Sequence, residues 1–167
     1  MNCEYTRDIA LLNLLWCSGM RVGEIHLLNI SDIDLEKCSI IVKGKGNKQR
    51  KVYFNGATKV WIDKYLSERK DNNPALFVTL KNGFHKNEPN RLSIKAIEAR
   101  LKIIADKSGI EGIYPHKFRR TMASSMARKN ISVDKIAKLL GHEKISTTQD
   151  YLVKNQNDIE NSYKFCF

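Results

Sequence analysis

Residues 39–54 read Ser-Ile-Ile-Val-Lys-Gly-Lys-Gly-Asn-Lys-Gln-Arg-Lys-Val-Tyr-Phe. Two short runs with β-branched and aromatic residues flank a glycine-containing polar segment, which is typical of a β-hairpin. We therefore expect strands over 39–43 and 49–54, joined by a turn over 44–47. A further strand is expected over 75–80, because an apolar run there follows a turn signal.

Outside this hairpin, apolar residues recur at the spacing of helices. Thr6 is expected to cap a first helix that ends at Gly19, and a second short helix should begin near Arg21. Residues 31–36 are expected to form a polar turn. Further helices are expected over 57–69, from Ser93 to Gly109, over 116–129 and 133–140, and over parts of 146–163. The fold class expected is α+β, mostly α-helical with a small three-stranded antiparallel sheet.

The composition excludes several classes of protein. The chain has 167 residues, of which 42% are hydrophobic and 28% charged, so it can bury the core of one domain rather than remain disordered. No apolar run approaches the roughly 18 residues of a membrane helix, and the N-terminus does not resemble a signal peptide. Four scattered cysteines without a CxxC pair argue against a zinc knuckle or a disulfide framework. We expect a cytoplasmic protein with no membrane partner.

The positive charge is concentrated in two segments. The formal net charge is +11, yet residues 1–40 carry more acidic than basic side chains, while 41–70 and 111–154 hold the excess of lysine and arginine. Such basic segments favour a polyanion, most often nucleic acid, through contacts with phosphates. The alternative is a surface that serves only solubility, and the charge alone does not decide between the two.

Three motifs carry candidate chemistry, and each also has an ordinary structural explanation. Residues 132–151 are typical of a helix-turn-helix, with a capped first helix, a glycine at the turn and threonine opening the second helix. Two short packed helices commonly show the same pattern without binding DNA. His116 and Arg119 share one face of a helix, as in many solvated basic helices. Arg21 and Glu24 have the spacing of a common ion pair within a helix.

Taken together and in order, the motifs resemble those of the tyrosine recombinase (phage integrase) family: Ser-Gly-Met-Arg21-Val-Gly-Glu24, Gly-Lys45-Gly-Asn-Lys, His116-Lys-Phe-Arg119, Leu-Gly-His142 and Tyr151. The resemblance runs from about Thr6 to Tyr151 and includes the step from His142 to Tyr151. It implies the fold of a tyrosine recombinase catalytic domain. One departure is Arg120, at a position that is often histidine in the family.

The resemblance implies a site that binds the phosphate under attack. Arg21 and Arg119 match the family's two arginines, which clamp the non-bridging oxygens through charge-assisted hydrogen bonds. His142 would donate a further hydrogen bond to the phosphate. Glu24 would orient neighbouring groups rather than react.

The resemblance also assigns the groups that make and break bonds. Tyr151 would be the nucleophile that forms a 3′-phosphotyrosine link to DNA. Its phenol has an ordinary pKa of about 10, so a histidine acceptor and nearby positive charge must assist its deprotonation. His116 is the candidate acceptor, and Lys45 is the candidate general acid for the leaving 5′-hydroxyl. No cofactor or metal is expected, and the sequence shows no cluster of three carboxylates of the kind a two-metal nuclease needs.

The implied function is site-specific recombination or integration of double-stranded DNA, independent of ATP and metal, by a tetramer on paired sites that is a monomer in isolation. We expect a catalytic core over 1–154 and a C-terminal tail over 155–167 that is exchanged between subunits. The family's N-terminal core-binding domain is expected to be absent from this chain. Two alternatives remain open: a non-catalytic helix-turn-helix module that binds DNA, and a type IB topoisomerase, which shares the same chemistry.

Overall fold

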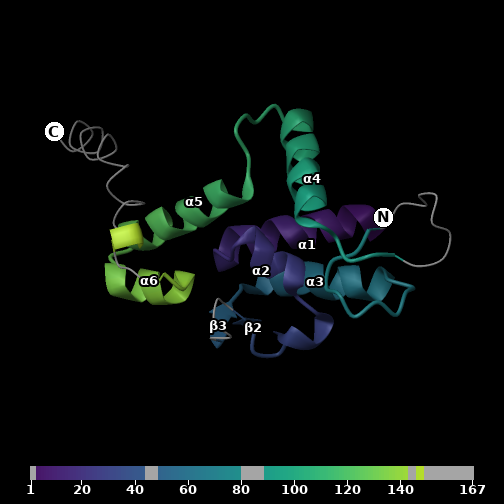
Figure 1. The fold of residues 1–167 in the computed structure, drawn as a ribbon, viewed down its shortest axis with the longest axis horizontal. Coiled ribbons are helices and arrows are strands. Elements are labelled where there is room, and N and C mark those ends of the chain that lie inside the picture. The colour runs from purple at the N-terminus through teal and green to yellow at the C-terminus, as the bar shows by residue number, and fades with distance from the viewer. Residues whose placement is uncertain (1–2, 44–48, 80–88, 143–145, 149–167) are drawn as a thin grey trace.

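The computed structural model describes residues 3–43, 49–79, 89–142 and 146–148, and Figure 1 shows their arrangement. The elements in chain order are α1 (Cys3–Ser18), α2 (Val22–Leu27), the 3₁₀ turn η1 (Ile30–Asp32), β1 (Ile33–Asp34), β2 (Ser39–Lys43), β3 (Gln49–Tyr53), α3 (Gly56–Glu68), α4 (Ile94–Lys107), α5 (Pro115–Arg128) and α6 (Val133–Leu140). The expected class, mostly helical with a three-stranded antiparallel sheet, is confirmed. None of the described helices is long and apolar enough to cross a membrane.

The sheet has the order β1-β2-β3, and the predicted hairpin strands are confirmed. Ile40 in β2 pairs with Val52 in β3 and with Ile33 in β1, so these three residues lie side by side across the sheet. The third strand therefore comes from Ile33–Asp34, where the sequence predicted a polar turn.

The strand predicted over 75–80 is wrong for the residues that the structure describes. Ala75 and Val78 form only isolated bridges, with Asn29 and Arg91 respectively. The run is apolar because it crosses the core as an extended segment: Leu76, Phe77 and Val78 are buried. A short apolar run between turn signals does not distinguish a buried strand from other buried segments.

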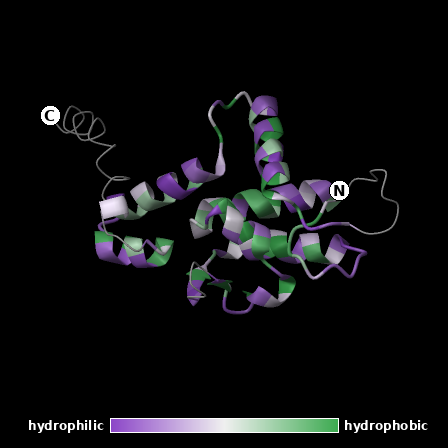
Figure 2. Ribbon diagram, in the orientation of Figure 1, coloured by the Kyte–Doolittle hydropathy of each residue, from purple (hydrophilic) through white to green (hydrophobic). Residues whose placement is uncertain are grey.

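Helix α1 lies at the centre of the main core. Its buried face packs on α3, and Figure 2 shows hydrophobic residues concentrated where α1, α2 and α3 meet. The sheet and the extended segment close the same core, whose buried members include Leu11, Leu14, Leu15, Met20, Ile40, Val52, Ile62, Tyr65 and Leu76. This core fixes the end of α1, where the candidate site begins.

A second, smaller cluster joins α5 and α6. Ala123, Ile136 and Leu140 are its buried members. Helix α5 also packs against α1, where Trp16 and Phe118 meet edge to face with ring centroids 6.4 Å apart. The C-terminal end of α6 is thereby carried next to the junction of α1 and α2.

The helix boundaries confirm most of the predicted caps. Ser93 caps α4 by accepting a hydrogen bond from the amide of Ala96, and Gly141 ends α6 with φ near +65°. The predicted cap at Thr6 is wrong, because α1 begins at Cys3 and the buried Thr6 hydroxyl donates to Glu68 on α3 at 2.8 Å. Ser132 precedes α6 as predicted, but its side chain makes no capping hydrogen bond.

Candidate active site

The turn between α1 and α2 positions Arg21. Gly19 has φ of +61°, and a Cβ at this position would lie 2.9 Å from the Leu140 side chain, so a glycine is required on both counts. Arg21 then precedes α2, where its amide donates to Glu24 Oε2 at 2.8 Å and its Nη1 donates to Glu24 Oε1 at 3.2 Å. The Arg21 side chain remains 48% exposed, so its guanidinium is anchored on one side and faces solvent on the other.

Arg119 is the largest fully buried side chain in the described part of the chain, at 2% exposure. It lies on α5, and its Nη1 donates to the Gly19 carbonyl while its Nη2 donates to the Leu140 carbonyl, both at 2.5 Å. The single guanidinium therefore ties the α1–α2 turn to the end of α6. Burial of a permanent charge is tolerated only with such partners.

The C-terminal end of α6 accepts hydrogen bonds from three arginines on three consecutive carbonyls. Arg50 Nε donates to Leu139 O at 3.1 Å, Arg119 Nη2 to Leu140 O, and Arg21 Nη2 to Gly141 O at 3.3 Å. The last carbonyls of a helix lack intrahelical partners and lie at the negative end of the helix dipole. The helix end is therefore a natural anchor for three cations, which it holds within one small region.

His142 follows the cap of α6 and lies in the same region. Its amide donates to Ala137 O at 3.0 Å, and its Nδ1 is 2.7 Å from Thr148 Oγ1. Burial, followed by the charges of Arg119, Arg21 and other cations, lowers the pKa of His142 from 6.5 to about 4. The imidazole is therefore neutral at pH 7 and is able to carry its proton on Nε2, with Nδ1 accepting from the threonine hydroxyl.

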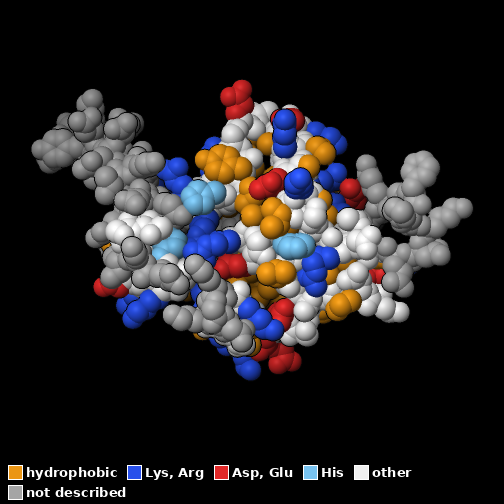
Figure 3. All heavy atoms as spheres, in the orientation of Figure 1, with side chains coloured by type: hydrophobic (Ala, Val, Ile, Leu, Met, Phe, Trp, Pro, Cys, Tyr) orange, Lys and Arg blue, Asp and Glu red, His pale blue; other side chains and the backbone are white. Residues whose placement is uncertain are grey.

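His116 is at the first turn of α5, after Tyr114 and Pro115. Burial and then the charges of Arg119, Arg120 and Arg21 lower its pKa below 6.5. A neutral imidazole is able to accept a proton, as a general base requires. Figure 3 shows histidine and basic side chains gathered on this face, near the junction of α5 and α6.

Four of the six predicted site residues are brought together among the described residues: Arg21, His116, Arg119 and His142. Lys45 and Tyr151 lie outside the described residues, so their predicted roles stay predictions. Within the described part of the chain, no group of three or more His, Cys, Asp or Glu side chains could hold a metal ion.

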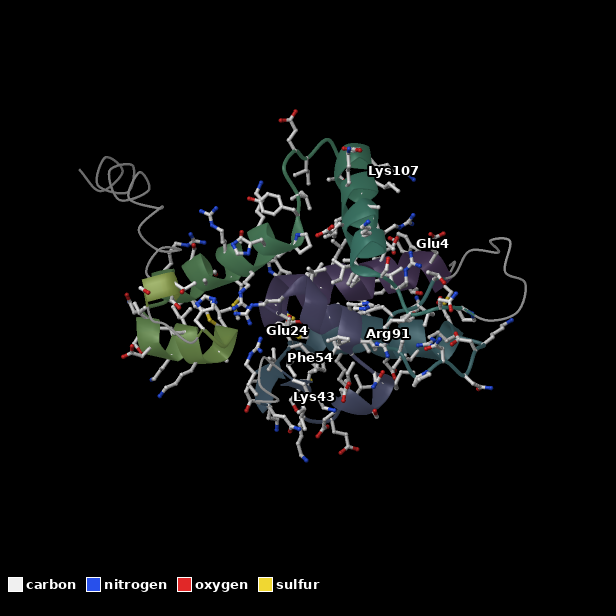
Figure 4. All side chains as sticks on the ribbon, in the orientation of Figure 1. Glu4, Glu24, Lys43, Phe54, Arg91 and Lys107 are labelled. Atoms are coloured by element: carbon white, nitrogen blue, oxygen red, sulfur yellow. The ribbon has the colours of Figure 1, made fainter. Side chains whose placement is uncertain are left out.

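Arg50 lies at the site although no motif in the sequence indicated it. Its guanidinium forms two hydrogen bonds with Glu24, at 2.7 and 2.8 Å, in addition to the bond with Leu139 O. Figure 4 shows Glu24 on α2 near Phe54, which directly follows β3. A signal was present in the sequence: strand alternation places Arg50 on the same face of β3 as the buried Val52, which is an unusual position for a charge.

The comparisons with known proteins define the class. The model of the phage integrase family matches residues 1–158, which is most of the chain. The chain therefore belongs to the phage integrase family.

Its relatives are tyrosine recombinases. The chain is 37% identical over 146 residues to tyrosine recombinase XerA of Pyrococcus horikoshii, an alignment that covers 87% of this chain and 50% of the relative. It is 32% identical over 149 residues to tyrosine recombinase XerC of Proteus mirabilis, covering 87% and 47% respectively. The chain thus spans about half the length of the curated relatives it matches.

Solved structures confirm the expected catalytic-domain fold. The crystal structure of XerA recombinase superposes with a TM-score of 0.82 at 30% identity, over 96% of this chain and 56% of that one. A XerH site-specific recombinase in a post-cleavage complex with its palindromic difH substrate shares the fold, with a TM-score of 0.77 at 23% identity, over 98% of this chain and 46% of that one.

Proposed function

We propose that this chain is the catalytic part of a site-specific recombinase that cleaves and rejoins double-stranded DNA through a covalent 3′-phosphotyrosine intermediate. The observation that carries the proposal is the convergence of Arg21 and Arg119 on adjacent carbonyls at the end of α6, next to the neutral His142. The fold shared with a recombinase that was solved in pre- and post-cleavage DNA complexes supports it.

The arrangement suits a phosphodiester under attack. In the transition state, negative charge develops on the non-bridging oxygens, and fixed donors aimed at them lower the barrier. Arg119 is held rigidly by two carbonyls, while Arg21 is half exposed and anchored on one side. His142 donates from Nε2 and adds a neutral hydrogen bond that needs no change of charge.

The Tyr151 oxygen attacks phosphorus, its proton passes to His116, and the bond to the 5′ oxygen breaks as Lys45 protonates that oxygen. The phosphotyrosine conserves the energy of the phosphodiester, so a second 5′-hydroxyl can attack it and reseal the strand without ATP. The lowered pKa of His116 supports its part, because the ring is neutral before the reaction.

A non-catalytic DNA-binding module is a weaker candidate. Such a module needs positive charge on its surface, but it does not need a buried arginine that links two helix ends. The same proposal includes action as a tetramer on paired DNA sites, residues 155–167 exchanged between subunits, and a cytoplasmic location. The family membership supports the tetramer on DNA and the location, whereas the exchange of residues 155–167, which lie outside the described residues, rests on the resemblance alone.

The test is covalent capture of DNA. A duplex with a nick next to the scissile phosphate releases a short fragment on cleavage and traps the protein on DNA, which denaturing electrophoresis detects. We expect Tyr151→Phe to abolish the adduct and leave non-covalent binding nearly unchanged. Tyr163→Phe is the matched control and should form the adduct at the wild-type rate. An adduct with Tyr151→Phe would show that another residue is the nucleophile.

A further inference from the structure

We propose that Arg50 is a positioning residue of this site, and that it acts by occupying Glu24 so that Glu24 does not capture Arg21. The inference rests on the proposed function, because it concerns how one phosphate-binding arginine is kept available. Arg50 on β3 and Glu24 on α2 take no part in the proposed bond-making step, and their contact is given a role here by its effect on Arg21.

Two guanidiniums bind the Glu24 carboxylate, and Arg50 makes more hydrogen bonds with it than Arg21 does. Arg50 forms a two-pronged pair with Glu24, Nη1 to Oε1 at 2.7 Å and Nη2 to Oε2 at 2.8 Å. The Arg21 side chain donates to Glu24 Oε1 through Nη1 alone, at 3.2 Å, and the Arg21 backbone amide donates to Oε2. The Arg50 and Glu24 side chains are 16% and 9% exposed, respectively, so this pair is largely shielded from water.

The geometry of the Arg50–Glu24 pair explains why Glu24 binds Arg50 more strongly than the Arg21 side chain. A planar guanidinium matches both oxygens of a carboxylate, and such two-pronged pairs are stronger and more directional than single contacts. Burial raises the pKa of Glu24, but the hydrogen bonds from Arg50 and the Arg21 amide outweigh burial and hold that pKa below its usual value. Glu24 is therefore an anion at neutral pH, and the hydrogen bonds from Arg50 are the largest of the effects that lower its pKa.

Removal of Arg50 would leave the largely buried Glu24 carboxylate compensated by Arg21 alone, which is unfavourable unless Arg21 moves closer. Arg21 is the cation already in contact with Glu24 and lies three residues away at the same helix start. It would close on both oxygens and turn its N–H groups away from solvent, where the phosphate arrives. Arg50 thus allows Glu24 to orient Arg21 through one weak contact.

Arg50 also links three elements at once. Its Nε donates to Leu139 O on α6, and a Cβ at Gly141 would lie 3.1 Å from the Arg50 side chain. The strand is thereby held against α2 and against the helix end that anchors Arg21 and precedes His142. A lysine at position 50 could supply charge but could not make the pair and the Leu139 contact together.

The experiment compares Arg50→Ala, Glu24→Gln and the double variant. Single-turnover adduct formation on the nicked duplex gives the cleavage rate, and fluorescence anisotropy gives DNA affinity. We expect Arg50→Ala to slow cleavage at least 100-fold with affinity changed less than threefold. The double variant should cleave at least tenfold faster than Arg50→Ala, because an amide at position 24 does not hold Arg21. A double variant no faster than Arg50→Ala would overturn the proposal.

A matched control separates positioning from general stability. Arg100 also pairs with carboxylates, Asp8 and Glu4, but between α4 and α1, away from the site. Arg100→Ala should lower the melting temperature and leave the cleavage rate of the folded protein unchanged. If Arg100→Ala slows cleavage as much as Arg50→Ala, the effect is one of stability and the inference is wrong. Arg50→Lys replaces Arg50→Ala if the alanine variant does not fold, with the same rescue by Glu24→Gln expected.

A second readout does not depend on cleavage, so it distinguishes failure of this inference from failure of the proposed function. Phenylglyoxal modifies accessible arginines, and mass spectrometry after digestion gives the rate at Arg21. We expect modification of Arg21 to slow at least threefold in Arg50→Ala and to recover with Glu24→Gln. An unchanged rate in Arg50→Ala would refute capture of Arg21, whether or not the wild-type protein forms an adduct.

Discussion

Substitution of Gly19 by alanine should destabilise the protein through two separable effects. The residue has φ of +61°, and a left-handed conformation costs an L-residue about 1–2 kcal/mol. The new Cβ would also lie 2.9 Å from both Leu140 Cδ2 and Met122 Sδ, and overpacking of this kind costs about 1–3 kcal/mol. We therefore expect a loss of about 2–5 kcal/mol in the free energy of unfolding.

Gly109→Ala isolates the first effect. Gly109 has φ of +64°, but a Cβ there would meet nothing within 4 Å. Its substitution should cost only the conformational part, about 1–2 kcal/mol. Urea denaturation followed by circular dichroism measures both, and equal slopes against urea would show that the unfolded states are comparable.

The two variants should also differ in cleavage. The Gly19 carbonyl accepts a hydrogen bond from Arg119, so a shift of this turn moves a phosphate-binding group, whereas Gly109 follows the C-cap of α4, away from the site. We expect slower adduct formation for Gly19→Ala alone, at a temperature where both variants are folded. Equal loss of stability in the two variants would refute the packing argument, since only Gly19 has a neighbour to displace.

Arg119→Ala should slow adduct formation by about 10²–10³-fold, because one preorganised donor to the transition state is lost; a rate within fivefold of wild type would contradict the assignment. Lys45→Ala should be partly rescued by a substrate with a 5′-bridging phosphorothiolate, whose sulfur leaves without a proton, and no rescue would mean that Lys45 only contacts DNA. His142 should titrate near pH 4 by NMR in the DNA-free protein, with His142→Gln identifying its signal. Because the folded state disfavours protonation of His142, its contribution to the free energy of unfolding should be fully present above about pH 6.5 and decline as the pH falls towards 4. A titration midpoint near pH 6.5 in the NMR experiment would refute the lowered pKa.

Local patterns in the sequence were sufficient for much of the fold. The hairpin strands were predicted by β-branched runs around a glycine-containing turn, and α4 and α6 by apolar spacing with Ser93 before one helix and Gly141 after the other. These signals depend only on residues that are close in sequence, so they can be recognised without knowledge of tertiary contacts. Residues 75–79 of the strand predicted over 75–80 were misassigned because burial, rather than strand pairing, explains their apolar side chains.

The motifs that carry the candidate catalytic residues could be predicted from the sequence, but the contacts that hold those residues in place could not. Arg21 and Arg119 were found because their spacing from other polar residues matches a known family. Arg50 was missed because its partners, Glu24 and Leu139, are far away in sequence, and a single charge in a strand is usually exposed. Nor does any local pattern indicate that Arg119 is buried, since its acceptors are carbonyls, which every residue carries.

The dependence of the site on the end of α6 has a consequence during protein synthesis. The three guanidiniums that meet there belong to residues 21, 50 and 119, and their acceptors lie 120, 89 and 21 residues further along the chain. A ribosome that has made α1, the sheet and α5 has therefore produced every one of these arginines without their common anchor. Domains fold as units while contacts between distant residues form late. A nascent or prematurely terminated chain that lacks α6 would lack the carbonyls on which the three guanidiniums meet, so the candidate active site would assemble only in a chain whose translation has passed that helix.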